Sequence, residues 1–225
     1  MSSGGTSVFV HEQVRAVQEL YADVLIGATE RTSGEQVRLL TERLAAGHRA
    51  GHRGAYVEVR NWHPGVADLD EAAVRALPLG RADFLGIVSR GHGYADPAQA
   101  EADATRPSAA FEAAVDAMLG GDLDQLRVAL AADPTLARTA SHWPHRATLL
   151  HYATANGVEI HRQVVPANLP ALVELVVQHG ADVNAIANAY GTAQRPLGLL
   201  LSSGHPHEAG VTPAVAAILR ASGAI

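Results

Sequence analysis

The side chains best suited to chemistry gather in one polar stretch in the second half of the chain. Within the thirteen residues 156–168, six side chains supply donors and acceptors of both charges: Asn156, Glu159, His161, Arg162, Gln163 and Asn168. A guanidinium can hold a carboxylate or phosphate through two parallel hydrogen bonds, and a carboxylate or imidazole can move protons. The stretch therefore predicts a site for a polar small molecule, with Arg162 on an anionic group and Glu159 or a histidine as acid or base. The alternative is that these side chains satisfy the backbone of a long loop.

The twelve histidines raise the question of a metal site. The closest pairs are His205 with His207, and His142 with His145. Zinc takes three or four ligands at about 2.0–2.2 Å, and the spacing identifies no third ligand for either pair. We therefore predict no metal and no cofactor.

Motifs of the common catalytic classes are missing from the sequence. There is no glycine-rich phosphate loop, no nucleophile elbow and no His-Glu-x-x-His. Ser202 and Ser203 offer hydroxyl groups, but no base and orienting acid accompany them at a recognisable spacing.

Composition narrows the class of protein. The 225 residues are 48% hydrophobic and 18% charged, which is typical of a globular chain, and 4% aromatic residues favour helices packed through small side chains. The formal net charge of −6 argues against nucleic acid as a partner. With no cysteine and no long apolar run, the chain is expected to be cytoplasmic, without disulfides, signal peptide or membrane span.

Apolar spacing in the first half predicts a set of helices. We expect one helix over about 8–29 and a second that begins at a capping box of Ser33 and Gln36 and ends at Gly47. Two shorter helices are expected over 70–77 and 81–90, and another begins at Asp96-Pro97. The stretch 47–54, which repeats Gly-His-Arg, is predicted to be a solvated loop, with a small anion site as the alternative. Residues 105–108 are the expected boundary with the second half.

Helices in the second half come in pairs separated by short turns. One pair covers about 109–119 and 123–130, a second opens at Thr148 and closes over 169–178 before Gly180, and a last helix covers about 213–221. Such a pair is too small to bury its own apolar face, so the pairs must stack on one another.

The second pair resembles an ankyrin repeat. Thr148-Leu149-Leu150-His151 stands where that family has Thr-Pro-Leu-His, and Gly180-Ala181-Asp182-Val183-Asn184-Ala185 matches the closing signature of the repeat. The resemblance implies an all-α protein, with an ankyrin-like helical solenoid of about three repeats over 107–225 after a helical leader over 1–106. The leader in turn resembles one found ahead of some bacterial ankyrin-repeat proteins, through Asn61-Trp62-His63-Pro64 and His92-Gly93-Tyr94-Ala95-Asp96.

The chain departs from the ankyrin pattern by two insertions. Gly180 follows Thr148 by 32 residues, about 11 more than in a repeat of period about 33, and the extra residues fall in 157–168. A second insertion covers 204–210. Because loops of neighbouring repeats project from one face, Tyr190 and His205 are expected near the first insertion. The resemblance also implies a structural, hydrogen-bonding role for His151, with catalysis as the alternative.

These observations predict a recognition module that binds another protein in a bacterial cytoplasm. The alternative is a small-molecule-binding protein or an enzyme of bacterial secondary metabolism, with its pocket formed by the leader and the loops 157–168 and 204–210. The residues predicted for that pocket are, as acid–base groups, Glu159, His151 and His205, and as ligand-binding groups, Arg162, Gln163, Asn156, Asn168 and Tyr190.

Overall fold

The computed structural model describes residues 6–225, and most of them are helical. We call residues 6–106 the leader and residues 107–225 the C-terminal part. The leader holds one short strand, six α-helices and one 3₁₀ turn: β1 (Val8–Phe9), α1 (Glu12–Leu25), η1 (Ala28–Glu30), α2 (Ser33–Arg49), α3 (Arg53–Trp62), α4 (Glu71–Arg75), α5 (Arg81–Gly91) and α6 (Pro97–Ala102). The C-terminal part holds β2 (Val165–Pro166), β3 (Ala187–Ala189), β4 (Thr192–Gln194), α7 (Ala109–Gly120), α8 (Leu123–Ala132), α9 (Leu149–Tyr152), α10 (Leu169–Gln178), α11 (Pro196–Ser202), α12 (Gly204–Glu208) and α13 (Thr212–Ala221).

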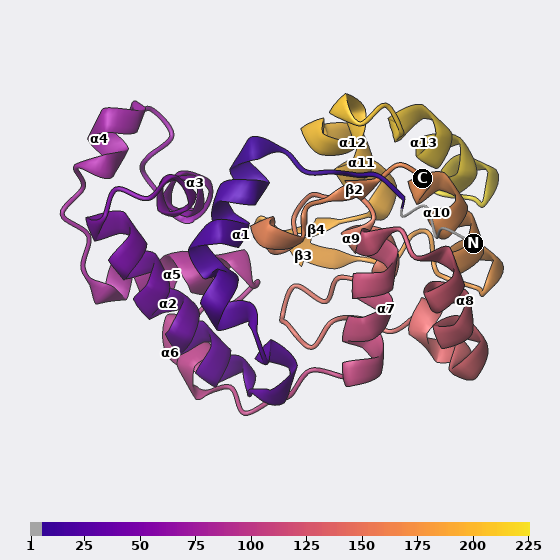
Figure 1. Ribbon diagram of the computed structural model, residues 1–225, viewed down its shortest axis with the longest axis horizontal. Helices are drawn as coiled ribbons and strands as arrows, with labels where there is room; N and C mark the ends of the chain where they lie inside the picture. The colour runs from indigo at the N-terminus through magenta and orange to yellow at the C-terminus, as the bar shows by residue number, and fades with distance from the viewer. Residues whose placement is uncertain (1–5) are drawn as a thin grey trace.

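The leader is a bundle in which α1 packs on α2 and α3, and α5 packs on α2 and α3 (Figure 1). The predicted helices are present, with two local differences. The capping box that opens α2 uses Thr32 and Glu35 rather than Ser33 and Gln36, because the Thr32 side chain accepts from the Glu35 amide and the Glu35 carboxylate accepts from Thr32. In addition, the predicted loop over 47–54 is largely helical.

Two glycines explain why helices replace that loop. A Cβ on Gly54 would lie 2.2 Å from the carbonyl oxygen of Ala16, and one on Gly47 would lie 2.4 Å from Leu20 Cδ1. These glycines therefore allow α2 and α3 to approach α1 closely, so α2 continues to Arg49 and α3 starts at Arg53.

The C-terminal part arranges its helices in two rows. In one row α9 contacts both α7 and α11, and in the other α10 contacts both α8 and α13. A single core runs between the rows and includes Phe111, Leu126, Leu150, Leu172 and Val215. The bounds predicted for α10 are correct, and Gly180 follows this helix in the left-handed region, with φ +84°.

Three features of the C-terminal part differ from the expectation. The helix after Thr148 ends at Tyr152, because Ala155 and Gly157 take positive φ values. The insertion 157–168 contains a 3₁₀ turn, η3 (Ile160–Arg162), and the strand β2, which pairs antiparallel with β1. Residues 204–208 of the second insertion form α12. The strands β3 and β4 form an antiparallel hairpin that was not predicted from the sequence.

The leader and the C-terminal part share side chains as well as the β1–β2 ladder. Trp143 and Ile160 come from the C-terminal part, yet both are buried in the leader core, where they join residues such as Leu20, Leu40 and Trp62. Within residues 6–225 no helix combines the length and apolar character needed to cross a membrane.

Candidate functional site

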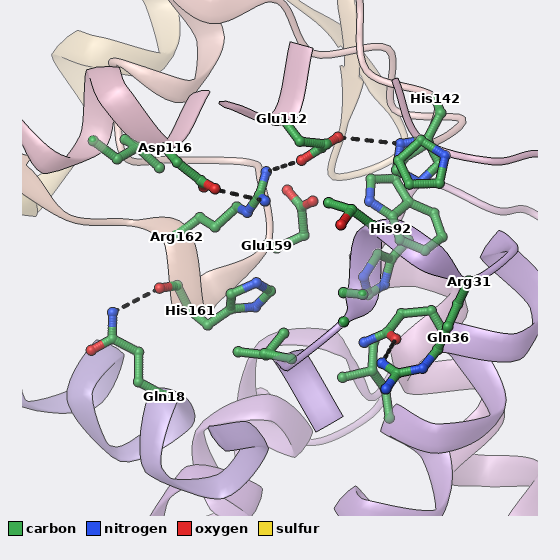
Figure 2. A pocket seen from close by; sticks show the side chains of 18 of the residues that line it. Gln18, Arg31, Gln36, His92, Glu112, Asp116, His142, Glu159, His161 and Arg162 are labelled. Carbon is green, nitrogen blue, oxygen red and sulfur yellow. Dashed lines mark hydrogen bonds and ion pairs between the residues drawn. The ribbon is translucent and has the colours of Figure 1, made fainter. Parts of the chain in front are cut away.

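A cavity of about 630 Å³ lies where the leader meets the C-terminal part. Its leader side is formed by α1, α2 and the connection between them, and its other side by α7 and two loops of the C-terminal part. Figure 1 shows where these elements lie, and Figure 2 shows side chains of the wall. The leader residues in its wall are Val8, Val10, Gln18, Leu25, Gly27, Ala28, Thr29, Arg31, Thr32, Ser33, Gln36, Leu40 and His92. The remaining wall residues are Pro107, Glu112, Asp116, Leu119, Gly120, His142, Trp143, Glu159, His161, Arg162 and Val164. This volume suits a small organic molecule.

Helix α7 supplies two carboxylates to the cavity wall. Glu112 and Asp116 are four residues apart, so they share one face of the helix, and Arg162 from η3 reaches both. Its Nη1 is 2.7 Å from Glu112 Oε2 and its Nη2 is 3.6 Å from Asp116 Oδ1, as Figure 2 shows. Burial alone would raise the pKa of Glu112, but His142 and the Arg162 charge outweigh it and lower that pKa. Burial raises the pKa of Asp116, against the effect of Arg162.

The loop between η2 (Pro134–Ala137) and α9 places two histidines and Trp143. The Ser141 amide donates to the Ala147 carbonyl and the Trp143 amide donates to the Ser141 hydroxyl, so the loop closes tightly on itself. His142 Nδ1 lies 3.4 Å from Glu112 Oε1. His145 Nδ1 accepts from the Ala147 amide, so its Nε2 carries the proton when the ring is neutral; this nitrogen lies 3.6 Å from Glu159 Oε2.

Glu159 is as deeply buried as Glu112, at 5% exposed. Tyr152 donates to its Oε1 at 3.3 Å, and His145 and Arg162 lie beside it. Burial would raise the pKa of Glu159, but the neighbouring His145 ring and the Arg162 charge hold it well below its usual range. The carboxylate is therefore ionised at neutral pH.

Two further histidines in the wall are neutral. Burial lowers the pKa of His92 to about 4 and that of His161, which also faces the Arg162 charge, to about 3. Nδ1 of His92 donates to the Val88 carbonyl at 2.8 Å, so Nε2 is the ring's acceptor, and the ring packs on Trp143 with centroids 4.3 Å apart.

Behind this wall lies a much smaller cavity of about 10 Å³, close to the space that one water molecule occupies. His92, Glu159 and His161 line both cavities. On its leader side stand Tyr21 and Glu58, and burial raises the pKa of Glu58 to about 8. Glu58 is consequently a neutral carboxylic acid at pH 7.

The pair His142–Glu112 has the arrangement of a general base and the carboxylate that orients it. A carboxylate at Nδ1 favours the tautomer that keeps its proton there, which leaves Nε2 of His142 as the acceptor. The separation of 3.4 Å is longer than a typical hydrogen bond, and catalytic pairs often shorten when a ligand binds. The wall can therefore bind a polar group and transfer a proton to or from it.

The structure brings together two of the residues predicted for a pocket. Glu159 and Arg162 lie in the cavity wall, between the leader and the loop 157–168. Arg162 was predicted to hold an anionic ligand; that role stays a prediction, and its guanidinium here faces two carboxylates of the protein. The buried Gln163 donates to the Val158 carbonyl, and Asn168 donates to the Gly121 carbonyl, so both amides brace the loop.

The other predicted residues lie outside this cavity. Tyr190 stacks on Trp62 with ring centroids 5.3 Å apart, and its hydroxyl donates to Asn156 at 2.6 Å. His205 lies beside His11, with centroids 5.1 Å apart. His151 is buried under Gln194: its Nδ1 accepts from the Thr148 amide, and its Nε2 is 3.3 Å from the Gln194 carbonyl oxygen.

Sequence reasoning did not assign Glu112, Asp116 or His142 to the pocket, although the two acids carried a signal. Glu112 and Asp116 lie four residues apart on the helix predicted over about 109–119, so the sequence places both acids on one face of that helix. His142 was considered only as a metal ligand. Within residues 6–225 no group of three or more His, Asp or Glu side chains is arranged to hold a metal ion.

Comparisons with protein-family descriptions, with curated proteins and with solved structures yield no match to this chain.

Proposed function

We propose that this protein binds a small molecule in the cavity between the leader and the C-terminal part, and that His142 with Glu112 transfers a proton there. The observation that carries the proposal is the charged wall itself. Glu112 and Glu159 are 4% and 5% exposed, yet both face a cavity of about 630 Å³ rather than a packed interior. Burying two carboxylates is costly, and perturbed ionisable groups around a cavity are typical of functional sites.

A thermal-shift screen with small metabolites tests the binding proposal. A ligand present at about 100 times its Kd stabilises the folded protein by about 2.7 kcal/mol, which raises Tm by several degrees. Ala28 lines the cavity, so Ala28→Phe should fill part of it and remove the shift. Ala22 is exposed on α1 and outside the cavity wall, so Ala22→Phe is the matched control and should keep the shift. A ligand shift of equal size in both variants would contradict the proposal.

The proton-transfer proposal has a separate test. Once a ligand is found to be converted, His142→Gln should reduce kcat about 100-fold or more while changing the ligand's Kd little, because general acid–base catalysis contributes roughly 10²–10⁴-fold. If His142→Gln keeps the wild-type kcat, His142 is not the proton-transfer group and only the binding proposal stands.

We further propose that residues 107–225 form a short ankyrin-like solenoid of three helix pairs: α7 with α8, α9 with α10, and α11 with α13. Three observations support this. The pairs make two rows of contacting helices, Gly180 ends α10 in the left-handed conformation, and the Thr148–His151 segment closes its own capping interaction. The β3–β4 hairpin between α10 and α11 also suits such a stack.

A protein partner is the second candidate function, and one observation favours it. Two large apolar side chains lie exposed at the two ends of β3, Ile186 at 56% and Tyr190 at 49%, and aromatic and apolar side chains are common at recognition surfaces. A photo-cross-linking amino acid at Ile186 should capture a defined protein in cells, and the same group at Val128, exposed on α8, should not. Equal capture at both positions, or none at Ile186, would contradict this function.

A further inference from the structure

The cavity wall on the C-terminal side carries more negative than positive charge. Glu112, Asp116 and Glu159 stand around a single cation, Arg162 (Figure 2). The neutral His92 and His161 add no positive charge.

The other guanidinium of the cavity is already occupied. Arg31 donates to the carbonyl oxygens of Val24 and Ile26 at 2.9 and 2.7 Å, and to the Gln36 side chain at 2.9 Å. Arg31 therefore ties the connection after α1 to α2, and three hydrogen bonds to neutral oxygens hold its guanidinium in that place.

Two carboxylate oxygens of the wall are buried without a hydrogen bond. These are Glu112 Oε1 and Glu159 Oε2, whose nearest histidine nitrogens lie 3.4 and 3.6 Å away. A buried acceptor left without a donor is unfavourable, so a ligand that brings donors gains the hydrogen bonds that the protein does not make. A ligand that brings acceptors meets like charge instead.

The rest of the cavity is suited to an apolar body. Apolar side chains that line it come from both sides of the molecule: Val8, Val10, Leu25, Leu40, Leu119 and Val164. The ring of Trp143 also lies in the wall, and an aromatic face attracts a cation when water is excluded.

We infer that the ligand of this cavity is a small amphiphilic amine, whose ammonium group lies against Glu112 and Asp116 and whose hydrocarbon part lies against the apolar side chains. This inference rests on the proposed function, because it names the chemical class that the same cavity accepts. It also assigns the Arg162 charge to the protein's own carboxylates rather than to a ligand.

Three probes with one skeleton and different head groups test the inference: cyclohexylmethylamine, cyclohexylmethanol and cyclohexanecarboxylate. The chain has two tryptophans, so its indole N–H groups give two NMR signals. Trp143 lines the cavity, whereas Trp62 packs under Tyr190, and Trp143→Phe assigns the two signals.

The amine should move the Trp143 signal and bind about tenfold more tightly than the alcohol, since a hydrogen bond to a charged group is worth about that factor. The carboxylate should bind most weakly.

Matched variants locate the head group. Glu112→Gln and Asp116→Asn should each weaken amine binding about fivefold or more, by the same reasoning, and should leave the alcohol's affinity unchanged. Asp124→Asn makes the same change of net charge on the exposed face of α8 and should have no effect. Because Asp116 is exposed, Asp116→Asn keeps the test valid even where Glu112→Gln impairs folding.

The results distinguish a wrong ligand class from a wrong binding site. If the alcohol or the carboxylate moves the Trp143 signal with an affinity equal to that of the amine, the ligand class is wrong and the cavity remains a binding site. If none of the three probes moves the Trp143 signal, or the amine moves only that of Trp62, both the ligand class and the proposed site are wrong.

Discussion

Arg162 is the residue on which the charged wall depends. It is the cation shared by Glu112, Asp116 and Glu159, and its guanidinium carbon lies 5.7 Å from the ring centre of Tyr152. Burial would lower the pKa of Arg162, but these acids raise it, so the side chain stays charged.

Replacing Arg162 by methionine should destabilise the protein by about 3–5 kcal/mol, the usual cost of leaving a buried charge without its partner. Methionine keeps most of the bulk, so the loss reports charge rather than a cavity. Urea unfolding measures it. Arg127→Met, in an exposed pair with Asp124, should be close to wild type. Equal stability of the two variants would mean that the wall needs no compensating charge.

Glu58 makes the stability of the protein depend on pH. Its pKa in the folded protein is about 8, above the 4.5 of an ordinary glutamate, so the folded state binds a proton that the unfolded state releases. This contribution to stability is complete below about pH 4.5 and is lost as the pH rises toward 8. His92 and His161 act in the opposite sense, since their lowered pKa values make the protein lose stability as pH falls below about 6.5.

Glu58→Gln should therefore abolish the loss of stability that the wild type shows between about pH 6 and 8, which we expect to be on the order of 2 kcal/mol. Denaturant unfolding at several pH values checks this. Glu174→Gln, an exposed change on α10, should keep the wild-type slope. The same slope in Glu58→Gln would show that the buried carboxyl does not titrate in this range.

At the scale of elements, the turn after α5 and the loop that carries His142 and His145 lie in direct contact. Gly93 has φ +86°, and a Cβ there would lie 2.4 Å from the His145 amide nitrogen, while the His145 amide itself donates to the His92 carbonyl. Only glycine allows this approach, and the approach holds the loop against the leader.

Gly93→Ala should therefore cost about 2 kcal/mol or more, from the left-handed conformation together with the clash, and should shift the Trp143 indole signal. Gly198→Ala is the matched control: this glycine lies inside α11 with open space around it, so alanine should stabilise the protein by about 0.5–1 kcal/mol. A Gly93→Ala variant as stable as the wild type would contradict the described contact.

The sequence predicted helices well because their signals are local. Apolar spacing placed α1, α5 and α10 to within a few residues, and Gly180 marked the end of α10. Helices in the Gly-His-Arg stretch were missed because there the glycines serve packing against α1 rather than a turn. The pairing of β1 with β2 was also missed, because it joins residues far apart in the chain and no local sequence pattern predicts it.

Only the part of the candidate site that lies within one loop could be predicted from the sequence. Glu159 and Arg162 belong to one loop, so their proximity follows from the sequence. Their partners Glu112 and His142 lie on a different helix and a different loop, and only the packing of α7 against α9 and β2 brings them close. Tyr190 and His205 were assigned to the same pocket by analogy between repeats, whereas the structure places them outside it.

For the whole molecule, the shared core predicts that the leader and the C-terminal part unfold together. Ile160 belongs to the C-terminal part and is buried in the leader core at 6% exposure. Ile160→Ala should destabilise the protein by about 2–5 kcal/mol, and native-state hydrogen exchange should show an equal loss of protection in α3 and in α10. Ile186→Ala, at an exposed isoleucine, should change neither. Loss confined to α3 would show two independent folding units.

The central claim is that the cavity between the two parts is a binding site, and a crystal structure of the protein with a stabilising ligand tests it most directly. We predict electron density for the ligand between α2 and α7, in contact with Glu112 and Trp143 and next to Arg162. A ligand found instead beside the stacked rings of Trp62 and Tyr190, or a cavity closed by repacked side chains with Glu112 turned toward solvent, would contradict the account.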